Sequence, residues 1–342
     1  MAEPMLEVRD LHVYFALRQA LLRRALGERA EVLRAVDGVD LDIAKGEALG
    51  LVGESGCGKS TLGRAIIGLY RPTSGVIRIT GKELSPRPER SERQRMQMVF
   101  QDPYSSLNPR MSVRQTLNEL LRVHEMVPKQ DIGRRCRELL DLVGLGVQAL
   151  DAYPHQFSGG QRQRVAIARA LALEPELLIA DEPVSALDVS VQATVLNLLA
   201  ELRARLGLTM LFISHNMAVV RHVCDRVAVM YLGRIVETAP TEELFSNARH
   251  PYTQALLKAV PRLVLGPRHE AAAVSGDPPS PIRVPPGCRF HPRCPIAQAV
   301  CRVQDPVLVP GSGNAAHFAA CHFAWTTPPP AHPADIDVAA RT

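Results

Sequence analysis

The residues with the most definite chemical role lie at positions 53–61, which read GESGCGKST. They match the pattern GxxxxGK[ST] of a phosphate-binding loop, in which glycines let the backbone fold so tightly that successive N–H groups point at an anion. The pattern assigns Lys59 to the β- and γ-phosphates of a nucleotide and the Ser60 hydroxyl to Mg²⁺. We therefore expect nucleotide contacts from the whole loop: Gly53, Glu54, Ser55, Gly56, Cys57, Gly58, Lys59, Ser60 and Thr61.

Two adjacent carboxylates follow an apolar run further along the chain. Residues 177–180 lead directly into Asp181 and Glu182. Asp181 is suited to hold Mg²⁺, and Glu182 is suited to orient and polarise an attacking water. Adjacent acids at the end of a strand can also be solvated edge charges, but the phosphate-binding loop upstream favours a catalytic pair.

A second segment, formed by Ser158, Gly159, Gly160 and Gln161, has the composition of an anion-binding helix start. It combines exposed backbone amides with a serine hydroxyl, and a helix with one apolar face follows it. A chain with one phosphate-binding loop does not need two such cradles. The segment is therefore predicted to serve a nucleotide held by another copy, which implies a head-to-tail dimer with two composite sites.

The elements that must position these residues alternate along most of the chain. Short apolar runs at 48–52, 177–180, 210–214 and 227–231 have the character of strands, and helix-like stretches lie between them. This alternation predicts an α/β domain with a largely parallel sheet.

Composition excludes several other classes of protein. The 342 residues carry 40 Lys and Arg against 35 Asp and Glu, a net charge of +5 that is too small and too dispersed to indicate a nucleic-acid partner. No apolar run approaches the ~18 residues of a membrane span. The first 15 residues include acidic side chains and no long apolar stretch, so we expect no secretory signal, a cytosolic location and no disulfides.

The C-terminal part differs in composition, because 15 of the 27 prolines lie in residues 261–342. We expect a first domain over 1–260 that contains the whole nucleotide site, a Pro- and Cys-rich module over 261–325, and a disordered tail over 326–342. Residues 16–31 are interpreted as a solvated helical insertion with its leucines on the domain, or alternatively as a membrane-surface helix.

Four of the seven cysteines lie in the C-terminal module, separated by 5, 6 and 19 residues: Cys288, Cys294, Cys301 and Cys321. Zinc sites favour two close C-x₂₋₄-C pairs, which these gaps do not provide. Four thiolates can instead hold a [4Fe–4S] cluster. We expect such a cluster to staple a segment with little apolar content, and zinc or free or paired thiols are the alternatives.

In their order along the chain, these motifs resemble those of the nucleotide-binding subunits of ABC transporters, over residues 6–260. The matching elements are the phosphate-binding loop, Gln101 of the Q-loop, the signature at 158–161, Asp181 and Glu182 of Walker B, the D-loop ending at Asp188, and the switch residue His215. Phe157 and Asn216 stand where the family more often has Leu and Asp. The resemblance implies a RecA-like parallel sheet, an antiparallel edge subdomain and a helical subdomain over about 103–165.

The resemblance also implies roles for single residues. The catalytic residues would be Glu182, His215, Gln101 and Lys59. The Mg²⁺ ligands would be Ser60, Gln101 and Asp181. An aromatic ring of the first strand region would stack on adenine, with Phe15 the best fit and Tyr14 the neighbouring candidate. Asp188 and the four signature residues would contact the nucleotide.

Three further segments resemble bacterial oligopeptide and dipeptide importers: residues 99–110, 226–236 and 247–256. The resemblance implies an ATPase peripheral to the inner membrane, at its cytoplasmic face, that energises peptide import with a second ATPase subunit as a heterodimer, two membrane-spanning permease subunits and a substrate-binding protein. Residues 285–295 resemble the C-terminal module of the same importers, in which a [4Fe–4S] cluster is known.

Two alternatives to a peptide importer stay open at this point. Nickel and glutathione importers share the same segments, so the cargo is not fixed by them. A soluble ABC ATPase acting on ribosomes or DNA is an alternative from another class, but such proteins typically carry two cassettes or a long inserted coiled coil, and this chain has neither feature.

Overall fold

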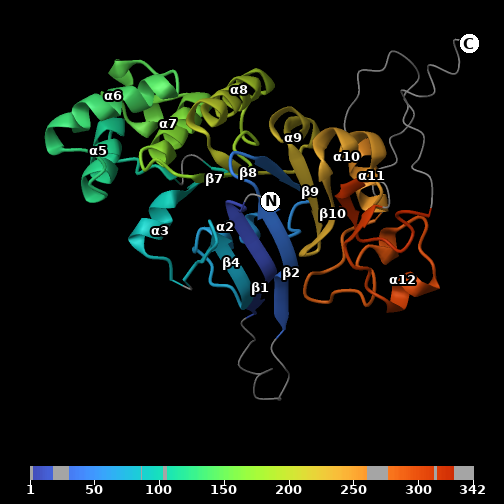
Figure 1. Cartoon of the computed structure of the whole chain (residues 1–342). Helices are drawn as coiled ribbons and strands as arrows, with labels where there is room; N and C mark the ends of the chain where they lie inside the picture. The colour runs from blue at the N-terminus through green and yellow to red at the C-terminus, as the bar shows by residue number, and fades with distance from the viewer. Residues whose placement is uncertain are drawn as a thin grey trace, which may run out of the picture.

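The computed structural model describes residues 3–17, 31–85, 87–102, 106–259, 276–311 and 314–326 (Figure 1). Most of the predicted insertion at 16–31, the first part of the C-terminal module and nearly all of the predicted disordered tail lie outside the described residues. The described fold consists of two sheets, a helix between them and a helical layer over one end.

An eight-stranded sheet forms the centre of the fold, in the order β11-β12-β10-β9-β3-β8-β7-β6. Its strands are β3 (Ala48–Val52), β6 (Met96–Val99), β7 (Leu177–Asp181), β8 (Thr209–Ser214), β9 (Arg226–Tyr231), β10 (Arg234–Pro240), β11 (Val309–Gly311) and β12 (Asn314–Ala319). The strands β6, β7, β8, β3 and β9 run parallel, and β3, β7 and β8 are buried along their whole length. Strands covered on both faces need apolar side chains throughout, which explains the continuous apolar runs. The predicted α/β fold with a largely parallel sheet is confirmed.

A second, antiparallel sheet packs beside the first. It consists of β1 (Leu6–Ala16), β2 (Val32–Ile43), β4 (Ser74–Ile79) and β5 (Lys82–Glu83), in the order β2-β1-β4-β5. The helix α2 (Lys59–Ile66) lies between the sheets, and its buried side chains share one apolar core with residues of both. The short helix α3 (Arg90–Arg95) leads into β6. This second sheet is the antiparallel edge subdomain that the family resemblance implies.

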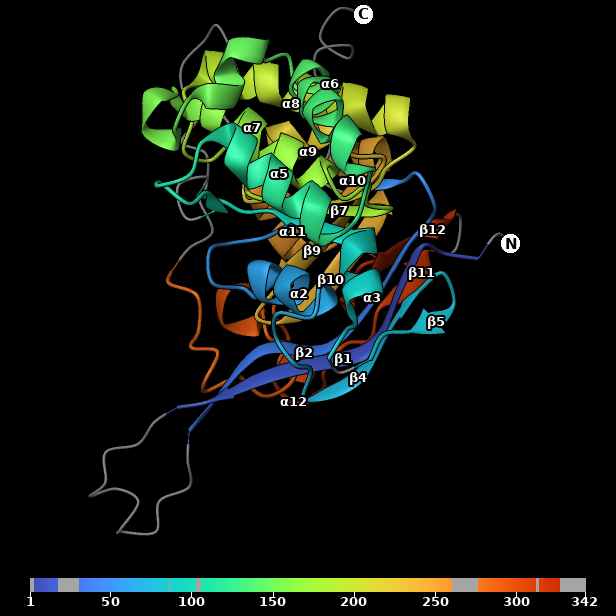
Figure 2. The ribbon, with the colours of Figure 1, turned by 90° about the vertical axis from the view of Figure 1, so that its left-hand side faces the viewer.

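A helical layer lies on the chain between β6 and β8, and Figure 2 shows it above α2 and the two sheets. Its helices are α5 (Val113–Val123), α6 (Ile132–Leu142), α7 (Gly159–Leu171) and α8 (Val189–Leu206), with short 3₁₀ turns at Lys129–Asp131, Val147–Asp151 and Pro154–Gln156. At the start of α5, Ser112 and Gln115 form a capping box, in which each side chain bonds the other residue's backbone N–H. The layer begins within the predicted range of 103–165, but α7 continues beyond it to Leu171.

The C-terminal part of the chain that carries the four cysteines, residues 276–326, is called the Cys-bearing end here, and it does not form a layer of its own. After α9 (Met217–Val223), α10 (Thr241–Asn247) and α11 (Pro251–Lys258), it contributes a 3₁₀ turn (His291–Arg293), α12 (Ala299–Val303) and the strands β11 and β12. Strand β12 pairs with β10 and so extends the main sheet. The edge of β10 would otherwise present unpaired backbone groups. This pairing joins residues of the predicted C-terminal module to the main sheet.

A buried polar network also joins the Cys-bearing end to the antiparallel sheet. Asp37 on β2 accepts hydrogen bonds from Tyr14 and from Arg289, and Arg289 also donates to the carbonyl oxygen of Leu232. Burial alone would raise the pKa of Asp37, but the hydrogen bonds from Tyr14 and Arg289 outweigh it and lower the pKa to about 2. The folded chain therefore favours the charged carboxylate at this junction.

We expect Asp37→Asn to destabilise the fold by about 3–5 kcal/mol at neutral pH, because it leaves Arg289 buried without its counter-ion. The pKa of Asp37 is below its usual 3.8 in the folded chain, so its contribution to the free energy of unfolding is present above about pH 4 and is lost as the pH falls toward 2. Thermal unfolding at a series of pH values should show the Tm difference between wild type and variant narrowing below about pH 4. A difference that stays constant would contradict this account, and Asp40→Asn, at an exposed acid of the same strand, is the control.

Candidate nucleotide-binding and hydrolysis site

The phosphate-binding loop turns between the end of β3 and the start of α2. Gly58, the residue before α2, has φ 112°, and a Cβ at this position would overlap the carbonyl oxygen of Ala35. Only glycine fits such a position. Among the described residues no side chain caps α2, so its first N–H groups are available to an anion, as the sequence pattern predicts.

Lys59 lies buried within this loop. Its ammonium group donates to the carbonyl oxygens of Gly53 and Glu54, at 2.8 and 2.9 Å. These bonds hold the positive charge inside the turn that is predicted to bind phosphates. The Cys57 thiol is buried in the core between the two sheets, and burial raises its pKa. Cys57 is therefore a packed, protonated thiol that serves the loop through its backbone.

The two predicted Mg²⁺ ligands Ser60 and Asp181 lie in contact. The Ser60 hydroxyl donates to Asp181 Oδ1 at 2.8 Å, and Asp181 is fully buried at the end of β7. Burial raises the pKa of Asp181, and within the described part of the chain its Oδ2 accepts no hydrogen bond. A buried carboxylate oxygen with free lone pairs, next to a hydroxyl, is the kind of oxygen donor set that Mg²⁺ takes. The residues present fit the predicted ion.

Three of the four predicted catalytic residues, Gln101, Glu182 and His215, lie together. The Oε2 atom of Glu182 lies 3.2 Å from Gln101 Nε2 and 3.1 Å from His215 Nδ1. The three residues follow β6, β7 and β8, whose carboxyl ends share one edge of the sheet. Glu182 also has φ 47°, an uncommon conformation for a non-glycine residue, and its N–H donates to the carbonyl of Ile213. The backbone therefore fixes a carboxylate whose side chain is also held from both sides.

The signature segment lies at the start of α7, away from this cluster. Ser158 and Gln161 form a capping box there, with the Ser158 hydroxyl accepting from the Gln161 N–H at 3.3 Å. A Cβ on Gly160 would overlap the side chain of Val191 on α8, so glycine allows the two helices to pack closely. In the described part of the chain no hydrogen bond or ion pair joins this segment to residues 53–61, so the single chain does not bring the two cradles together.

Asp188 and Asn216 stand at the starts of α8 and α9. Asp188 is the N-cap residue of α8, although its side chain makes no capping hydrogen bond among the described residues. Asn216, where the family more often has Asp, accepts hydrogen bonds from the N–H groups of Ala218 and Val219. Asparagine therefore caps α9 as an aspartate would, which explains why this departure leaves the helix after His215 intact.

The two candidate adenine-stacking rings have different surroundings. The Phe15 ring is partly buried and lies edge-on to Tyr70, with ring centroids 5.3 Å apart. The Tyr14 hydroxyl donates to Asp37, and burial with this hydrogen bond raises its pKa to about 12. Tyr14 is thus committed to the polar network of the Cys-bearing end, which favours Phe15 as the stacking residue.

Two residues that the sequence interpretation missed contact the phosphate-binding loop. The Tyr252 hydroxyl accepts a hydrogen bond from the Glu54 N–H at 2.7 Å, and the Arg293 guanidinium pairs with both Glu54 carboxylate oxygens at 2.7 and 2.9 Å. Arg293 lies outside residues 1–260, so the contacts that support the loop extend beyond the part of the chain that is expected to contain the nucleotide site. The one signal in the sequence was Glu54 itself, because a carboxylate in a phosphate-binding loop favours a positively charged partner nearby.

Two known protein families match parts of this sequence, and individual known proteins match most of it. Residues 36–185 match the family of ABC transporters, and residues 236–301 match the oligopeptide/dipeptide transporter C-terminal region. The chain is 50% identical to the oligopeptide transport ATP-binding protein AppF of Bacillus subtilis, over 94% of this chain and 98% of that protein. This chain belongs to the ABC transporter family. It is also 47% identical to the oligopeptide transport ATP-binding protein OppF of Escherichia coli, over 93% of this chain and 95% of that protein.

Solved structures of ABC cassettes share the fold. CbiO1 from Clostridium perfringens, part of the ABC transporter complex CbiONQ, matches with a TM-score of 0.60 at 30% identity, over 71% of this chain and 91% of that one. The ATP-binding cassette MJ0796, in a dimeric post-hydrolysis state bound to ADP and Pi, matches with a TM-score of 0.60 at 27% identity, over 69% and 99%. The prediction of an ABC ATPase is confirmed.

The four C-terminal cysteines of this ABC cassette are free thiols. Burial raises the pKa of Cys288 and Cys294 to about 11 and also raises that of Cys321, and the Cys301 side chain is buried. Backbone N–H groups of Phe290, Ile296 and Phe323 bond the sulfurs of Cys288, Cys294 and Cys321, respectively. In the ranges that the structure describes, no three His, Cys, Asp or Glu side chains are arranged to hold a metal ion. The predicted iron–sulfur cluster is thus not supported by ligand geometry.

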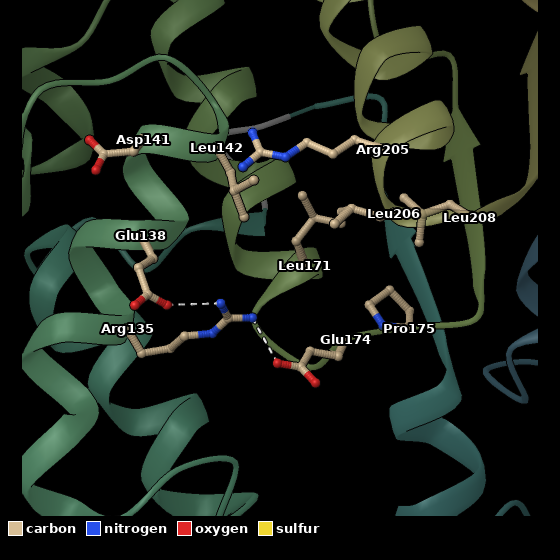
Figure 3. A pocket seen from close by; sticks show the side chains of 10 residues that line it. All are labelled: Arg135, Glu138, Asp141, Leu142, Leu171, Glu174, Pro175, Arg205, Leu206 and Leu208. Atoms are coloured by element: carbon tan, nitrogen blue, oxygen red, sulfur yellow. Dashed lines mark hydrogen bonds and ion pairs between the residues drawn. The ribbon is translucent and has the colours of Figure 1, made fainter.

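A cavity of about 620 Å³ lies elsewhere in this ABC cassette, between α6 and the C-terminal ends of α7 and α8 (Figure 3). On its wall Arg135 bridges Glu138 and Glu174, at 3.1 and 2.7 Å. The cavity borders the segments before β7 and β8, at the amino ends of these strands, and no predicted site residue lines it. The nucleotide site at the carboxyl edge is therefore separate from it.

We expect Glu182→Gln to retain nucleotide binding but to lower ATP turnover by about 100-fold or more, because an amide cannot accept the proton of the attacking water. Phosphate release and nucleotide affinity would be measured on the assembled transporter. Glu174→Gln, at an exposed acid before the same strand, is the matched control. Turnover within a few-fold of wild type would remove Glu182 from the catalytic role.

Proposed function

We propose that this ABC cassette hydrolyses ATP to energise the import of oligopeptides or dipeptides. The observation that carries the proposal is the meeting of Gln101, Glu182 and His215 next to the strand end that bears Asp181. A held carboxylate at this edge suits hydrolysis rather than nucleotide binding alone. The cargo rests on relatives named as oligopeptide and dipeptide transport ATP-binding proteins, which match over most of the chain.

Each group of residues has a separate task in this proposal. The loop N–H groups and Lys59 bind and orient the phosphates, while Ser60 and Asp181 hold Mg²⁺, with Gln101 as a third group. When bound, Mg²⁺ neutralises charge that develops on the phosphate oxygens. Glu182 orients the attacking water and takes its proton, and His215 holds the Glu182 carboxylate in place.

We further propose that the active unit is a pair of cassettes arranged head to tail. Among the described residues no hydrogen bond or ion pair joins the capped start of α7 to the phosphate-binding loop of its own chain, which leaves Ser158, Gly159, Gly160 and Gln161 for the nucleotide of a partner. Asp188 would lie at the same interface. The related cassette MJ0796 is dimeric in its solved structures, which supports this arrangement.

The remaining partners follow from the relatives and are also proposals. We place the chain at the cytoplasmic face of the membrane with two permease subunits, a second ATPase subunit as a heterodimer, and a substrate-binding protein. Among the helices that the structure describes, none has the length and apolar character to span a bilayer. CbiO1 is described as part of a transporter complex, which supports assembly with membrane subunits.

We propose four segments of the chain: a nucleotide-binding domain over 1–260, its helical subdomain over about 103–165, a Cys-bearing region over 261–325 and a tail over 326–342. The match of separate family patterns to 36–185 and 236–301 supports two functional parts. The pairing of β12 with β10 implies that these parts fold against each other rather than apart.

Transport assays test the cargo. The chain would be co-expressed with its membrane subunits, reconstituted in vesicles, and assayed with its binding protein for uptake of a labelled tripeptide and for peptide-stimulated phosphate release. Stimulation by the peptide supports the proposal. Stimulation by Ni²⁺ or glutathione alone would overturn the peptide assignment, and an absence of ATP hydrolysis would overturn the function as a whole.

We expect Ser158→Arg to leave the nucleotide affinity of the isolated subunit unchanged and to abolish hydrolysis by the assembled pair, because a bulky cation would occupy the place of a hydroxyl at the partner's phosphates. Isothermal titration and phosphate release would measure the two effects. Ser112→Ala, which breaks the equivalent capping box of α5, controls for the loss of a helix cap, worth about 1 kcal/mol. An equal loss of nucleotide binding by the isolated subunit would show that the site is not shared.

We also propose that Cys288, Cys294, Cys301 and Cys321 hold a [4Fe–4S] cluster. The four thiols are free, and backbone N–H groups bond three of the sulfurs, which partly offsets the rise in pKa that burial causes. Four cysteine thiolates are the usual ligands of such a cluster, which would cross-link a segment with a small core of its own. Its role is structural in this proposal, with no redox step.

Anaerobically purified protein is expected to be brown, with broad absorption near ~400 nm and about four irons and four sulfides per chain. Cys294→Ser should bleach it and make residues 276–326 more susceptible to proteolysis, because metal–thiolate bonds contribute folding energy. Cys136→Ser, at a buried thiol of α6, is the control and should stay brown. Stoichiometric zinc without iron would overturn the cluster but not the stapling, and free alkylation of all four thiols would overturn both.

A further inference from the structure

Glu54 connects the phosphate-binding loop to two distant parts of the chain. Its carbonyl oxygen accepts from Lys59 at 2.9 Å, and its N–H donates to Tyr252 on α11 at 2.7 Å. Its carboxylate pairs with Arg293, which lies on the 3₁₀ turn between two of the C-terminal cysteines. One loop residue is thus held through its backbone by one helix and through its side chain by the Cys-bearing end.

The pairing of Arg293 with Glu54 is close and bidentate, and it is buried on the arginine side, while the Glu54 side chain is 25% exposed. Both guanidinium nitrogens bond carboxylate oxygens, at 2.7 and 2.9 Å, and the Arg293 side chain is only 5% exposed. Arg293 also contacts the ring and the hydroxyl of Tyr231, whose ring packs with those of Tyr252 and Phe290. The hydrogen bond to Glu54 raises the pKa of Arg293, so the guanidinium stays charged. The aromatic cluster fixes the arginine in one place.

The negative charge of Glu54 opposes phosphate binding, and Arg293 neutralises it. A carboxylate within a loop that binds phosphates repels them, and the repulsion is strong where water is excluded. An arginine bonded to both carboxylate oxygens cancels that charge and holds the side chain in a fixed direction. Lys59, which bonds the same residue's carbonyl, then faces the phosphates without a competing anion.

We propose that Arg293 is a positioning residue of the nucleotide site, which neutralises Glu54 and so sets the affinity of the phosphate-binding loop for MgATP. This inference rests on the proposed function, because it concerns binding at the same loop. It assigns to the Cys-bearing end a direct contribution to nucleotide binding, in addition to its strand pairing with β10. The nucleotide affinity of this chain therefore depends on a residue outside residues 1–260.

A pair of variants distinguishes charge compensation from mere packing. Arg293→Gln leaves Glu54 uncompensated and is expected to weaken binding of a Mg²⁺-loaded, non-hydrolysable ATP analogue roughly tenfold. Glu54→Gln removes the charge that needs compensation, so the double variant Arg293→Gln with Glu54→Gln should bind within about twofold of wild type. Arg293→Lys keeps the charge and should bind more tightly than Arg293→Gln. Isothermal titration on the full-length chain measures each affinity.

Asp305→Asn is the matched control, because Asp305 pairs with Arg234 of β10 and thus also joins the Cys-bearing end to the core, without touching the loop. Its affinity should equal that of wild type. Tm values of all variants show whether each remains folded. If Arg293→Gln unfolds, the nucleotide affinities of the double variant and of Arg293→Lys still test whether Arg293 acts by neutralising Glu54.

Recovery of affinity in the folded double variant supports the proposal. Wild-type affinity in Arg293→Gln overturns it, and so does a double variant that binds as weakly as Arg293→Gln or more weakly. A wild-type chain that binds no nucleotide overturns the proposed function itself, which is a different result from equal binding by wild type and Arg293→Gln.

Discussion

The site must accommodate an anionic nucleotide beside three carboxylates, those of Glu54, Asp181 and Glu182. Charges brought this close repel one another unless each has its own partner, and the effect is largest where water is excluded. Glu54 pairs with Arg293, Asp181 accepts from Ser60, and Glu182 is bonded by Gln101 and His215. The rest of the structure positions the side chains that pair with these three carboxylates.

The parallel sheet brings Glu182 and its partner His215 together because it aligns the carboxyl ends of its strands. Strands β7 and β8 are buried along their whole length and pair in fixed register, with Asp181 opposite Ile213. The residues that follow them, Glu182 and His215, therefore meet without any flexible connection. Strand β3 pairs on the other side of β8 and places the phosphate-binding loop at the same edge. Precision at the site comes from burial of the strands that lead into it.

Sequence motifs predicted this edge well because each motif is local. A glycine-rich turn, an acid pair after an apolar run and a histidine at a strand end each specify their own backbone, and the parallel sheet brings them together. The pairing of Glu54 with Arg293 and that of Asp37 with Arg289 could not be found in this way. Their partners lie more than 200 residues apart, and an isolated arginine carries no periodicity or spacing that identifies its counter-ion.

The two arginine pairs indicate why the Cys-bearing end is built into the core rather than appended to it. Arg289 and Arg293 lie one turn apart, yet one bonds Asp37 on the antiparallel sheet and the other bonds Glu54 in the phosphate-binding loop. Both arginines are buried, so neither pair can open without exposing an uncompensated charge to a poorly solvated site. A displacement of this short segment would therefore act on the loop and on the sheet together. The phosphate-binding loop is consequently anchored on one side by the parallel sheet and on the other by the end of the chain.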